Sequence, residues 1–313
     1  MKKLDFENWP FHLSDLPPGS ALVGGAVRDA LLNREPYKKD LDIVVPKDAI
    51  NVVDCLVRKF GGRAVILDYK RDIARWAIKE WSIDLASCMG NSLEEDLWQR
   101  DFRINAIALI LSNTPKIFDP TGGLEDLLHK RLVAIQEANL LADPLRPLRG
   151  LRLMAELGLT LDPQTRTFIN SCAKYLPKAA PERIQSELNQ IVQIHEADEV
   201  IELLKKFHFL DAWNEESGIY NYNIPPLKYC HYMNDQELSI ALPIARINHL
   251  LSDNGVYNLR FKKRIYKRSN LLRKWQKLND GKGYKTLTED QIFNMHNELA
   301  DDVLALTFDL NSQ

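Results

Sequence analysis

The stretch from Ala21 to Val45, ALVGGAVRDALLNREPYKKDLDIVV, gathers residue types that suit phosphate chemistry. Gly24 and Gly25 follow a short apolar run and precede a segment with helical spacing. Such a glycine pair lets the backbone approach a ligand closely, and the free N–H groups at a helix start favour phosphate. Arg28 follows one helical turn later and offers a bidentate fork to the same anion. The pattern predicts a phosphate-binding turn, although such turns are also common as purely structural features.

Three carboxylates complete this chemistry. In a strand, residues i and i+2 share a face, so Asp40 and Asp42 would repel each other in the otherwise apolar run DLDIVV. A divalent cation removes the conflict, and Mg²⁺ takes one or two protein carboxylates together with water and substrate phosphate. Asp84, in SIDLAS, either completes the metal cluster, orients the nucleophile or simply ends a strand. The phosphate turn followed by paired carboxylates predicts phosphoryl transfer.

The elements that must position these residues form an α+β arrangement. Apolar runs predict strands at 21–23, 41–45, 64–67, 74–79 and 82–86, helices at 26–33 and 49–60, and either type at 104–111. Beyond residue 127 the pattern predicts helices at 136–141, 144–157, 163–175, 181–194 and 196–206, then a helical block over 236–313. We therefore expect a mixed β-sheet head with helices, followed by all-α segments, with a boundary near 224–228.

Bulk composition narrows the class of protein. The 313 residues suffice for about two domains, and 45% hydrophobic and 27% charged residues are ordinary for a globular chain. No apolar run approaches the roughly 20 residues of a membrane helix, and MKKLDFENWP lacks the apolar core of a secretory signal. Four scattered cysteines (55, 88, 172 and 230) argue against a disulfide framework or zinc site and indicate reduced thiols in a cytoplasmic protein.

Positive charge is concentrated near the C-terminus, although the net charge is only −2. The segment RFKKRIYKRSNLLRKWQK, from residue 260 to 277, contains no acid. Its candidate RNA-contacting residues are Lys262, Lys263, Arg264, Lys267 and Arg268. The segment is either a solvated helix face or a surface for phosphate backbone.

A second charged pattern repeats every three residues. Asp143, Arg146, Arg149 and Arg152 fall along one slowly drifting helix face. An Asp acceptor beside an Arg fork can match the Watson–Crick edge of cytosine and, with a small shift, that of adenine. The alternative is an ion-paired or solvated helix face.

Five segments in order resemble the class II tRNA nucleotidyltransferases, the bacterial CCA-adding and poly(A) polymerase family. GGAVRD with KDLDIVV resembles the catalytic motif, and RDFRINAIAL resembles the second motif, usually written RRDFTINA. DPTGGLEDL resembles the third motif, ADPLRPLRGLRLMAELGL the base-reading motif, and PERIQSEL the fifth. The resemblance covers roughly residues 20–190. It implies a catalytic head at 1–127, a neck at 128–180, a body at 181–235 and a basic RNA-binding tail at 236–313.

The resemblance also implies roles for individual residues. Asp40 and Asp42 would bind Mg²⁺, with Asp84 as a further catalytic candidate. The nucleotide would contact Gly24, Gly25, Arg28, Arg100, Asp101, Asn105, Asp143, Arg146, Arg149 and Arg152. Asp143 and Arg146 would pair with the base edge. The implied reaction adds CMP, or CMP and AMP, from CTP and ATP to a tRNA 3′ end and releases pyrophosphate.

Three departures from the family pattern bear on the product. The segment LASCMGNSLEEDLWQ, between Asp84 and Arg100, is shorter than the flexible loop of CCA-adding members, which favours addition of cytidines only, with a separate A-adding enzyme completing the end. Ala142 stands where the base motif usually has Glu, and Gln99 replaces an Arg. Both changes leave open a weakly active RNA-binding homologue, and a poly(A) polymerase of the same family is a further alternative.

Overall fold

The computed structural model describes residues 6–34, 39–214, 233–279, 287–306 and 308. The chain divides into two compact units. The head unit comprises Met1–Asn139 and Leu161–Thr165, and the arm unit comprises Leu140–Thr160 and Arg166–Gln313. In the described part of the chain, no helix combines the length and apolar character needed to cross a membrane.

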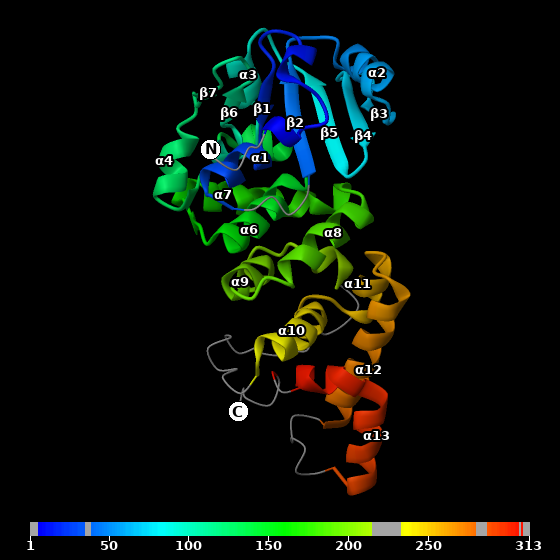
Figure 1. Ribbon diagram of the computed structural model, residues 1–313. Helices are drawn as coiled ribbons and strands as arrows, with labels where there is room; N and C mark the ends of the chain where they lie inside the picture. The colour runs from blue at the N-terminus through cyan, green and yellow to red at the C-terminus, as the bar shows by residue number, and fades with distance from the viewer. Residues whose placement is uncertain (1–5, 35–38, 215–232, 280–286, 307, 309–313) are drawn as a thin grey trace. The chain divides into compact units, whose positions relative to one another are not determined.

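The head unit is built on a seven-stranded sheet with the order β3-β4-β5-β2-β1-β6-β7 (Figure 1). Its strands are β1 Ala21–Val23, β2 Lys39–Val45, β3 Arg63–Asp68, β4 Ile73–Ile78, β5 Trp81–Ser87, β6 Ala108–Ile110 and β7 Lys116–Phe118. Strands β2 and β5 are parallel, whereas the other neighbouring pairs are antiparallel. The expected mixed sheet is confirmed.

Alternation along the strands separates a core face from an open face. On β2, Leu41 and Ile43 are buried, whereas Asp40 and Asp42 between and beside them are exposed. The same two-residue period continues on β4, where Trp76 is fully buried. Helix α2 (Ala49–Phe60) packs on β3, β4 and β5 and supplies their apolar cover (Figure 1). On the opposite face, called the open face below, Asp40 and Asp42 are exposed, whereas Val23 and Val44 pack with Leu97.

Short helices connect the strands of the head. They are α1 Gly25–Leu31, α3 Leu93–Trp98, α4 Gly123–Leu128 and α5 Glu137–Leu141, with 3₁₀ turns η1 Phe6–Asn8, η2 Leu13–Asp15 and η3 Arg103–Asn105. The apolar run at 104–111, for which the sequence predicts either a helix or a strand, divides into the end of η3 and strand β6. Helix α3 and strand β7 were not predicted.

The arm unit is helical, as expected. Its helices are α6 Arg146–Leu157, α7 Pro163–Cys172, α8 Pro181–Ile191, α9 Asp198–Lys206, α10 Asp235–Leu250, α11 Asp253–Asn258, α12 Lys263–Asn279 and α13 Glu289–Leu299. The short elements of the arm unit are η4 Ala173–Lys178, η5 Asp211–Trp213 and η8 Ala300–Leu306. Strand β8 (Arg131–Leu132), in the head unit, pairs with β9 (Thr160–Leu161) in a two-stranded sheet. Helix α7 begins in the head unit. The expected boundary near 224–228 lies outside the described residues, and the finer division into neck, body and tail stays a prediction.

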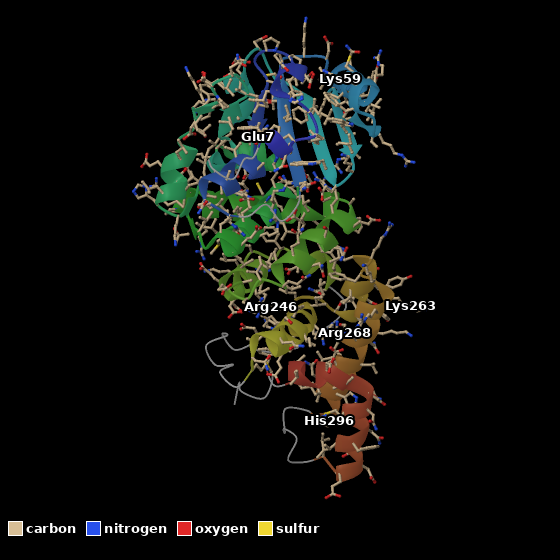
Figure 2. The ribbon with its side chains drawn as sticks, viewed as in Figure 1. Glu7, Lys59, Arg246, Lys263, Arg268 and His296 are labelled. Atoms are coloured by element: carbon tan, nitrogen blue, oxygen red, sulfur yellow. The ribbon has the colours of Figure 1, made fainter. Side chains whose placement is uncertain are left out.

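A buried arginine joins three helices of the arm unit. Arg246, on α10, is fully buried, and its guanidinium donates to the carbonyls of Val192 (3.2 Å), Ile194 and His195 (2.9 Å) and to Asp198 Oδ1 (2.7 Å) (Figure 2). Burial lowers the pKa of Arg246, although Asp198 opposes this shift. The three carbonyls come directly after α8, and Asp198 is the first residue of α9. Arg246 on α10 therefore links the end of α8 to the start of α9.

Candidate active site

The glycine turn after β1 lies against a carboxylate and a guanidinium. Gly24 has φ +74° and ψ −141°, a conformation that side-chain-bearing residues rarely adopt. A Cβ at this position would lie 3.2 Å from Asp42 Oδ2 and 3.7 Å from Arg100 Nη1. The structure therefore brings Gly24, Asp42 and Arg100 together, although 76 residues separate the first from the last.

The paired carboxylates of β2 lie on the open face, as the strand period predicted. Asp40 and Asp42 are both exposed around buried Leu41. Asp42 pairs with Val23 on β1, the residue before the glycine turn. Two exposed carboxylates beside a phosphate-type turn fit Mg²⁺, which takes few protein ligands and completes its shell with water and phosphate oxygens.

Asp84 lies beside Asp42 but is already bonded. The two aspartates are partners in the parallel register of β2 and β5. Both oxygens of Asp84 accept hydrogen bonds from Arg75 on β4, at 2.6 Å from Nε and 2.8 Å from Nη2. The hydrogen bonds that Arg75 donates to Asp84 raise the pKa of Arg75, and the charges of Asp84, Asp40 and Asp42 add to this effect. Arg75 therefore places a positive charge near the three carboxylates Asp40, Asp42 and Asp84.

A direct metal-binding role for Asp84 stays a prediction. Within the described residues there is no group of three or more His, Cys, Asp or Glu side chains arranged to hold a metal ion. Asp84 would first have to release part of its bidentate pair with Arg75. This partner could not be predicted from the sequence, because the pairing depends on the register of β4 against β5.

Arg28 is buried within a polar chain that leads to the second motif. Its Nε and Nη2 lie 2.9 and 2.8 Å from Asp29 Oδ1, and its Nη1 donates to Asn105 Oδ1 at 2.7 Å. Asn105 in turn donates to Asp101 Oδ1 at 3.1 Å. Gly25 is adjacent, since a Cβ there would lie 3.6 Å from Arg28 Nη2. The predicted nucleotide residues of both motifs therefore form one connected group, and their contact with triphosphate stays a prediction.

Arg100 is held by a residue that sequence reasoning missed. Asp96, a buried residue of α3, accepts from Arg100 Nε (3.3 Å) and Nη2 (3.1 Å). The other oxygen of Asp96 accepts the N–H of Met89 at 3.1 Å. The spacing of four residues between Asp96 and Arg100 was the available signal. The short segment before Arg100 thus contains a helix that orients this arginine.

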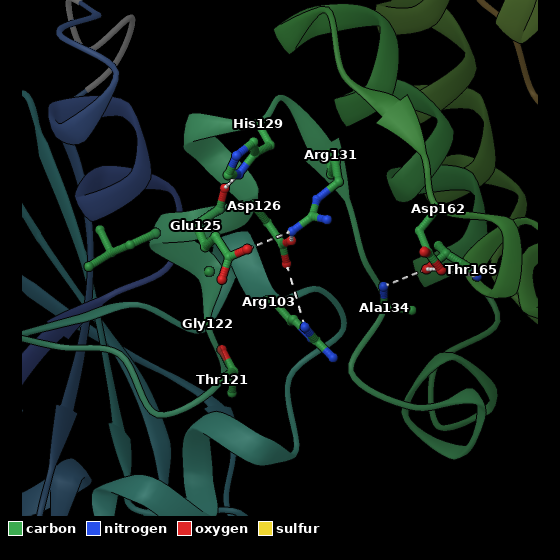
Figure 3. Close-up of polar contacts among 12 residues, drawn as sticks. Arg103, Thr121, Gly122, Glu125, Asp126, His129, Arg131, Ala134, Asp162 and Thr165 are labelled. Atoms are coloured by element: carbon green, nitrogen blue, oxygen red, sulfur yellow. Dashed lines mark hydrogen bonds and ion pairs between the residues drawn. The ribbon is translucent and has the colours of Figure 1, made fainter.

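The third motif, DPTGGLEDL, supports the turn that carries Asn105 (Figure 3). Asp119 begins α4 by accepting the N–H groups of Gly122 (3.1 Å), Gly123 (2.9 Å) and Leu124 (2.8 Å). Gly123 packs directly on the backbone of η3, where an added Cβ would lie only 2.2 Å from Arg103 O. The motif therefore packs against η3, the turn whose Asn105 is the hydrogen-bond partner of Arg28.

A buried carboxylate also contributes to this junction. Asp126 is 1% exposed and lies between two arginines, with Oδ1 at 2.9 Å from Arg131 Nη2 and Oδ2 at 3.9 Å from Arg103 Nη1 (Figure 3). Burial raises the pKa of Asp126, and this effect exceeds the opposing effect of the two arginines. Asp126 therefore links α4 to η3 through Arg103 and to strand β8 through Arg131.

We expect Gly123→Ala to destabilise the head and to weaken nucleotide binding. The methyl group cannot fit against Arg103 O, and overpacking of this kind costs about 1–3 kcal/mol. Because η3 would have to shift with Asn105, the KM for nucleotide should rise as well. Thermal unfolding and steady-state kinetics would measure both effects, with the exposed Leu124→Ala as the matched control. Unchanged stability and KM in Gly123→Ala would contradict this account of the third motif.

In the arm unit, Asp143 begins the base-reading segment. Its carboxylate accepts from Arg183 Nη2 on α8 at 2.7 Å and from the N–H of Leu145 at 3.0 Å. Burial would raise the pKa of Asp143, but the bonds from Arg183 and Leu145 and the charge of Arg149 outweigh burial and lower it. Asp143 is thus held as an ionised acceptor, with Arg183 Nη2 at 2.7 Å from one oxygen and Nη1 at 3.5 Å from the other.

Two of the predicted arginines on α6 pair with a second residue of α8. Arg152 Nε donates to Glu187 Oε2 at 2.7 Å, and Arg149 Nε lies 3.8 Å from Glu187 Oε1. Glu187 is buried, so its charge needs these partners. Glu187 and Arg183 were missed as site-supporting residues, although both lie in PERIQSEL and are four residues apart, which places them on one helix face.

The basic segment divides into two parts along α12. Arg268, labelled in Figure 2, is paired with Asp302. Arg273 is paired with Asp253 (3.0 Å) and Lys274 with Glu298 (2.7 Å), so these cations tie α12 to neighbouring elements. The contact with Asp302 raises the pKa of Arg268. Arg268 thus has a structural partner that was not predicted from the sequence. Of the five residues predicted to contact RNA, Arg268 has the least support.

The other four predicted cations are exposed at the start of the helix. We define the basic patch as Lys262, Lys263, Arg264 and Lys267, which have no acidic partner in the part of the chain that the structure describes. Helix α12 has no acid in its first turn. Cations at a helix N-terminus are disfavoured by the helix dipole, by roughly 0.3–1 kcal/mol each. Those cations of the basic patch that lie at the helix start thus cost local stability, and a bound anion would offset this cost.

Comparison with known proteins agrees with this geometry. Residues 20–133 match the model of the poly(A) polymerase head domain, and residues 158–218 match that of the probable RNA- and SrmB-binding site of polymerase A. The chain is 43% identical over 183 residues to a CC-adding tRNA nucleotidyltransferase of Synechocystis, covering 58% of this chain and 44% of the relative. It is 36% identical over 224 residues to a CC-adding enzyme of Thermus thermophilus, covering 70% and 49%.

An A-adding tRNA nucleotidyltransferase of Deinococcus radiodurans is 38% identical over 204 residues, which cover 64% of this chain and 46% of that protein. The chain thus spans about half the length of the curated relatives it matches. A solved tRNA nucleotidyltransferase with a primer tRNA and an ATP analogue shares the fold, with a TM-score of 0.70, 24% identity and coverage of 92% of this chain and 90% of that one. With both family models matching in order, the chain belongs to the tRNA nucleotidyltransferase and poly(A) polymerase family.

Proposed function

We propose that this protein is a template-independent nucleotidyltransferase that adds CMP, or CMP and AMP, to the 3′ end of tRNA. In this reaction the RNA 3′-oxygen bonds to the α-phosphorus of CTP or ATP, the hydroxyl proton is lost, and pyrophosphate leaves. The observation that carries the proposal is the convergence of Gly24, Asp42 and Arg100, since it places a phosphate turn, a metal-type carboxylate and a cation in one spot. The names of the relatives support the tRNA substrate.

Asp40 and Asp42 would hold Mg²⁺, with Asp84 beside them. Bound there, Mg²⁺ would supply positive charge that favours ionisation of the 3′-hydroxyl and stabilises the phosphates in the transition state. Around it, the N–H groups after Gly24 and the guanidinium of Arg100 would bind phosphate oxygens, while Asn105 and Asp101 orient Arg28. Most of the rate enhancement would come from positioning and electrostatics, as in phosphoryl transfer generally.

Base selection would fall to the arm unit. The Asp143 carboxylate would accept the amino group of cytosine or adenine, and the Arg146 fork would donate to ring acceptors. Arg149 and Arg152, paired with Glu187, would support this pair from α6. Because Asp143 is held ionised by Arg183, the site would be prepared to accept before the base arrives.

We further propose that the product is the CC end, with a separate A-adding enzyme acting on it. The short segment before Arg100 supports this choice, and it forms α3 in place of a longer loop. Several relatives carry the CC-adding name, whereas the Deinococcus radiodurans relative is A-adding. We place the reaction in the cytoplasm, in keeping with three described cysteines that form no disulfide among the described residues.

Two alternatives have specific support. The family model of the head is named for poly(A) polymerase, which would add AMP repeatedly. Ala142 and Gln99 depart from the family pattern, which favours a weakly active RNA-binding homologue. Release of pyrophosphate from CTP, in the presence of Mg²⁺ and a tRNA transcript lacking its CCA end, separates catalysis from binding. We expect release that requires all three components. Tight tRNA binding without release from any nucleotide would support the RNA-binding homologue instead.

We propose that the basic patch grips the tRNA through its phosphates. Lys262→Ala, Lys263→Ala and Arg264→Ala together should weaken tRNA binding and flatten its dependence on salt by up to about 2–3 units of the log–log slope, because fewer counterions are released. Filter binding between 50 and 200 mM salt would measure both effects. Arg268→Gln is the matched control and should change stability more than slope, since Arg268 pairs with Asp302. An unchanged slope in the triple variant would place RNA elsewhere.

A further inference from the structure

An exposed aromatic pair lies beside the basic patch. Tyr257, near the end of α11, is 72% exposed, although tyrosine is usually at least half buried when it serves the core. Its ring meets Tyr266 on α12 edge-to-face, with centroids 6.2 Å apart and planes at 67°. Tyr266 contacts the Tyr257 ring in this arrangement, yet most of the Tyr257 surface is left accessible.

The backbone around Tyr257 is firmly fixed. Ser252 caps α11 by accepting the N–H of Gly255 at 3.0 Å. The neighbouring side chains of Val256 and Leu259 are fully buried and anchor the helix. Arg260 then adopts φ +57° and ends the helix, with its N–H donating to Tyr257 O at 2.9 Å. A large exposed ring on such a rigid support loses little conformational entropy when a ligand covers it.

The charges beside Tyr266, the partner of this ring on α12, are those of a nucleic-acid surface. Tyr266 follows Lys262 and Lys263 by four and three residues on the same helical turn, and Lys267 comes next. The hydrogen bond from Tyr266 N to Lys262 O, at 3.2 Å, fixes this spacing. Cations with no acidic partner among the described residues suit phosphates, and an accessible ring suits the face of a base. A protein partner would more often meet an apolar surface with few lysines.

We propose that Tyr257 is a stacking platform for an RNA base that is unpaired or lies at the end of a helical stack, while the basic patch holds the adjoining phosphates. The inference rests on the proposed tRNA substrate and deepens it. Every base has a π-face, so stacking requires no particular sequence, which suits an enzyme that must accept many tRNAs. Loss of one such contact should weaken binding about 5- to 150-fold.

The test uses the full-length protein and a tRNA transcript lacking its CCA end. We expect Tyr257→Phe to bind like the parent, and Tyr257→Ala and Tyr257→Leu to bind about 10-fold more weakly with the salt slope unchanged. The leucine variant keeps an apolar side chain against Tyr266, so a merely structural role would be rescued by it. Thermal unfolding checks that all three variants fold.

Three outcomes would overturn the inference. If Tyr257→Ala binds tRNA like the parent, or if Tyr257→Leu restores binding, Tyr257 does not stack on RNA. If Tyr257→Ala flattens the salt slope, its effect acts through the phosphate contacts and not through stacking. Failure of the proposed function is recognised separately, because pyrophosphate release from CTP would then be absent in the parent protein as well.

Discussion

Asp42→Asn is expected to lower nucleotide incorporation by at least about 10³-fold, the scale seen when a main electrostatic contact to a transition state is lost. Asp42 lies at the centre of the candidate site, against the Gly24 turn and Arg100. Its amide analogue keeps the shape but lacks the negative charge that would hold Mg²⁺. Because the side chain is exposed, the fold should survive. Incorporation of labelled CMP and thermal unfolding would measure the two quantities.

Asp54→Asn provides the matched control, since Asp54 is an exposed aspartate on α2. It should leave incorporation unchanged. Asp40→Asn should follow Asp42→Asn, as both carboxylates share the open face of β2. Full activity in either Asp40→Asn or Asp42→Asn would contradict the assignment of these residues to a metal ion. A large loss of stability in Asp42→Asn would instead assign Asp42 a structural role.

Asp143→Ala is expected to lower kcat/KM for CTP by about 10- to 100-fold. A hydrogen bond to a charged group contributes roughly 1.5–3 kcal/mol, and the alanine variant removes the acceptor proposed for the cytosine amino group. UTP lacks that amino donor, so the low kcat/KM for UTP should change less than that for CTP. The ratio of the two kcat/KM values, which measures discrimination, should therefore fall. Competition between the two nucleotides would measure this ratio directly.

Arg183→Ala should produce a smaller shift in the same direction, because Asp143 would lose the partner that orients it. Glu199→Ala is the control, since Glu199 is an exposed acid of the arm unit that is absent from this group. Unchanged discrimination between CTP and UTP in Asp143→Ala would show that the base edge is read by other residues.

Local patterns were sufficient to predict the core of the head. The strand before Gly24, the helix after it and the alternation of β2 are all set by neighbouring residues, and each is confirmed. Helix α3 was missed because its six residues, LEEDLW, are too few to show a periodic apolar face. Strand β7 was missed because its three residues become a strand only by pairing with β6.

The predicted site residues are grouped in part by the structure, but their partners could not be predicted. Arg75 meets Asp84 through strand register, and Glu187 meets Arg152 through the packing of α6 on α8. Both contacts depend on tertiary structure. Because such contacts depend on tertiary structure, the sequence could not distinguish the paired from the exposed cations of the basic segment. Arg268 finds its acid 34 residues away in Asp302, whereas Lys263 finds none in the described residues.

The central claim is most directly tested by primer extension at single-nucleotide resolution. Three tRNA transcripts, ending before the CCA, after the first C and after CC, would each be incubated with Mg²⁺ and CTP, ATP or both. The account predicts that the first transcript gains two cytidines, the second gains one and the third gains none. Addition of a terminal A would contradict the CC product, a long A ladder would indicate a poly(A) polymerase, and no extension of any transcript would contradict the claim of nucleotidyl transfer itself.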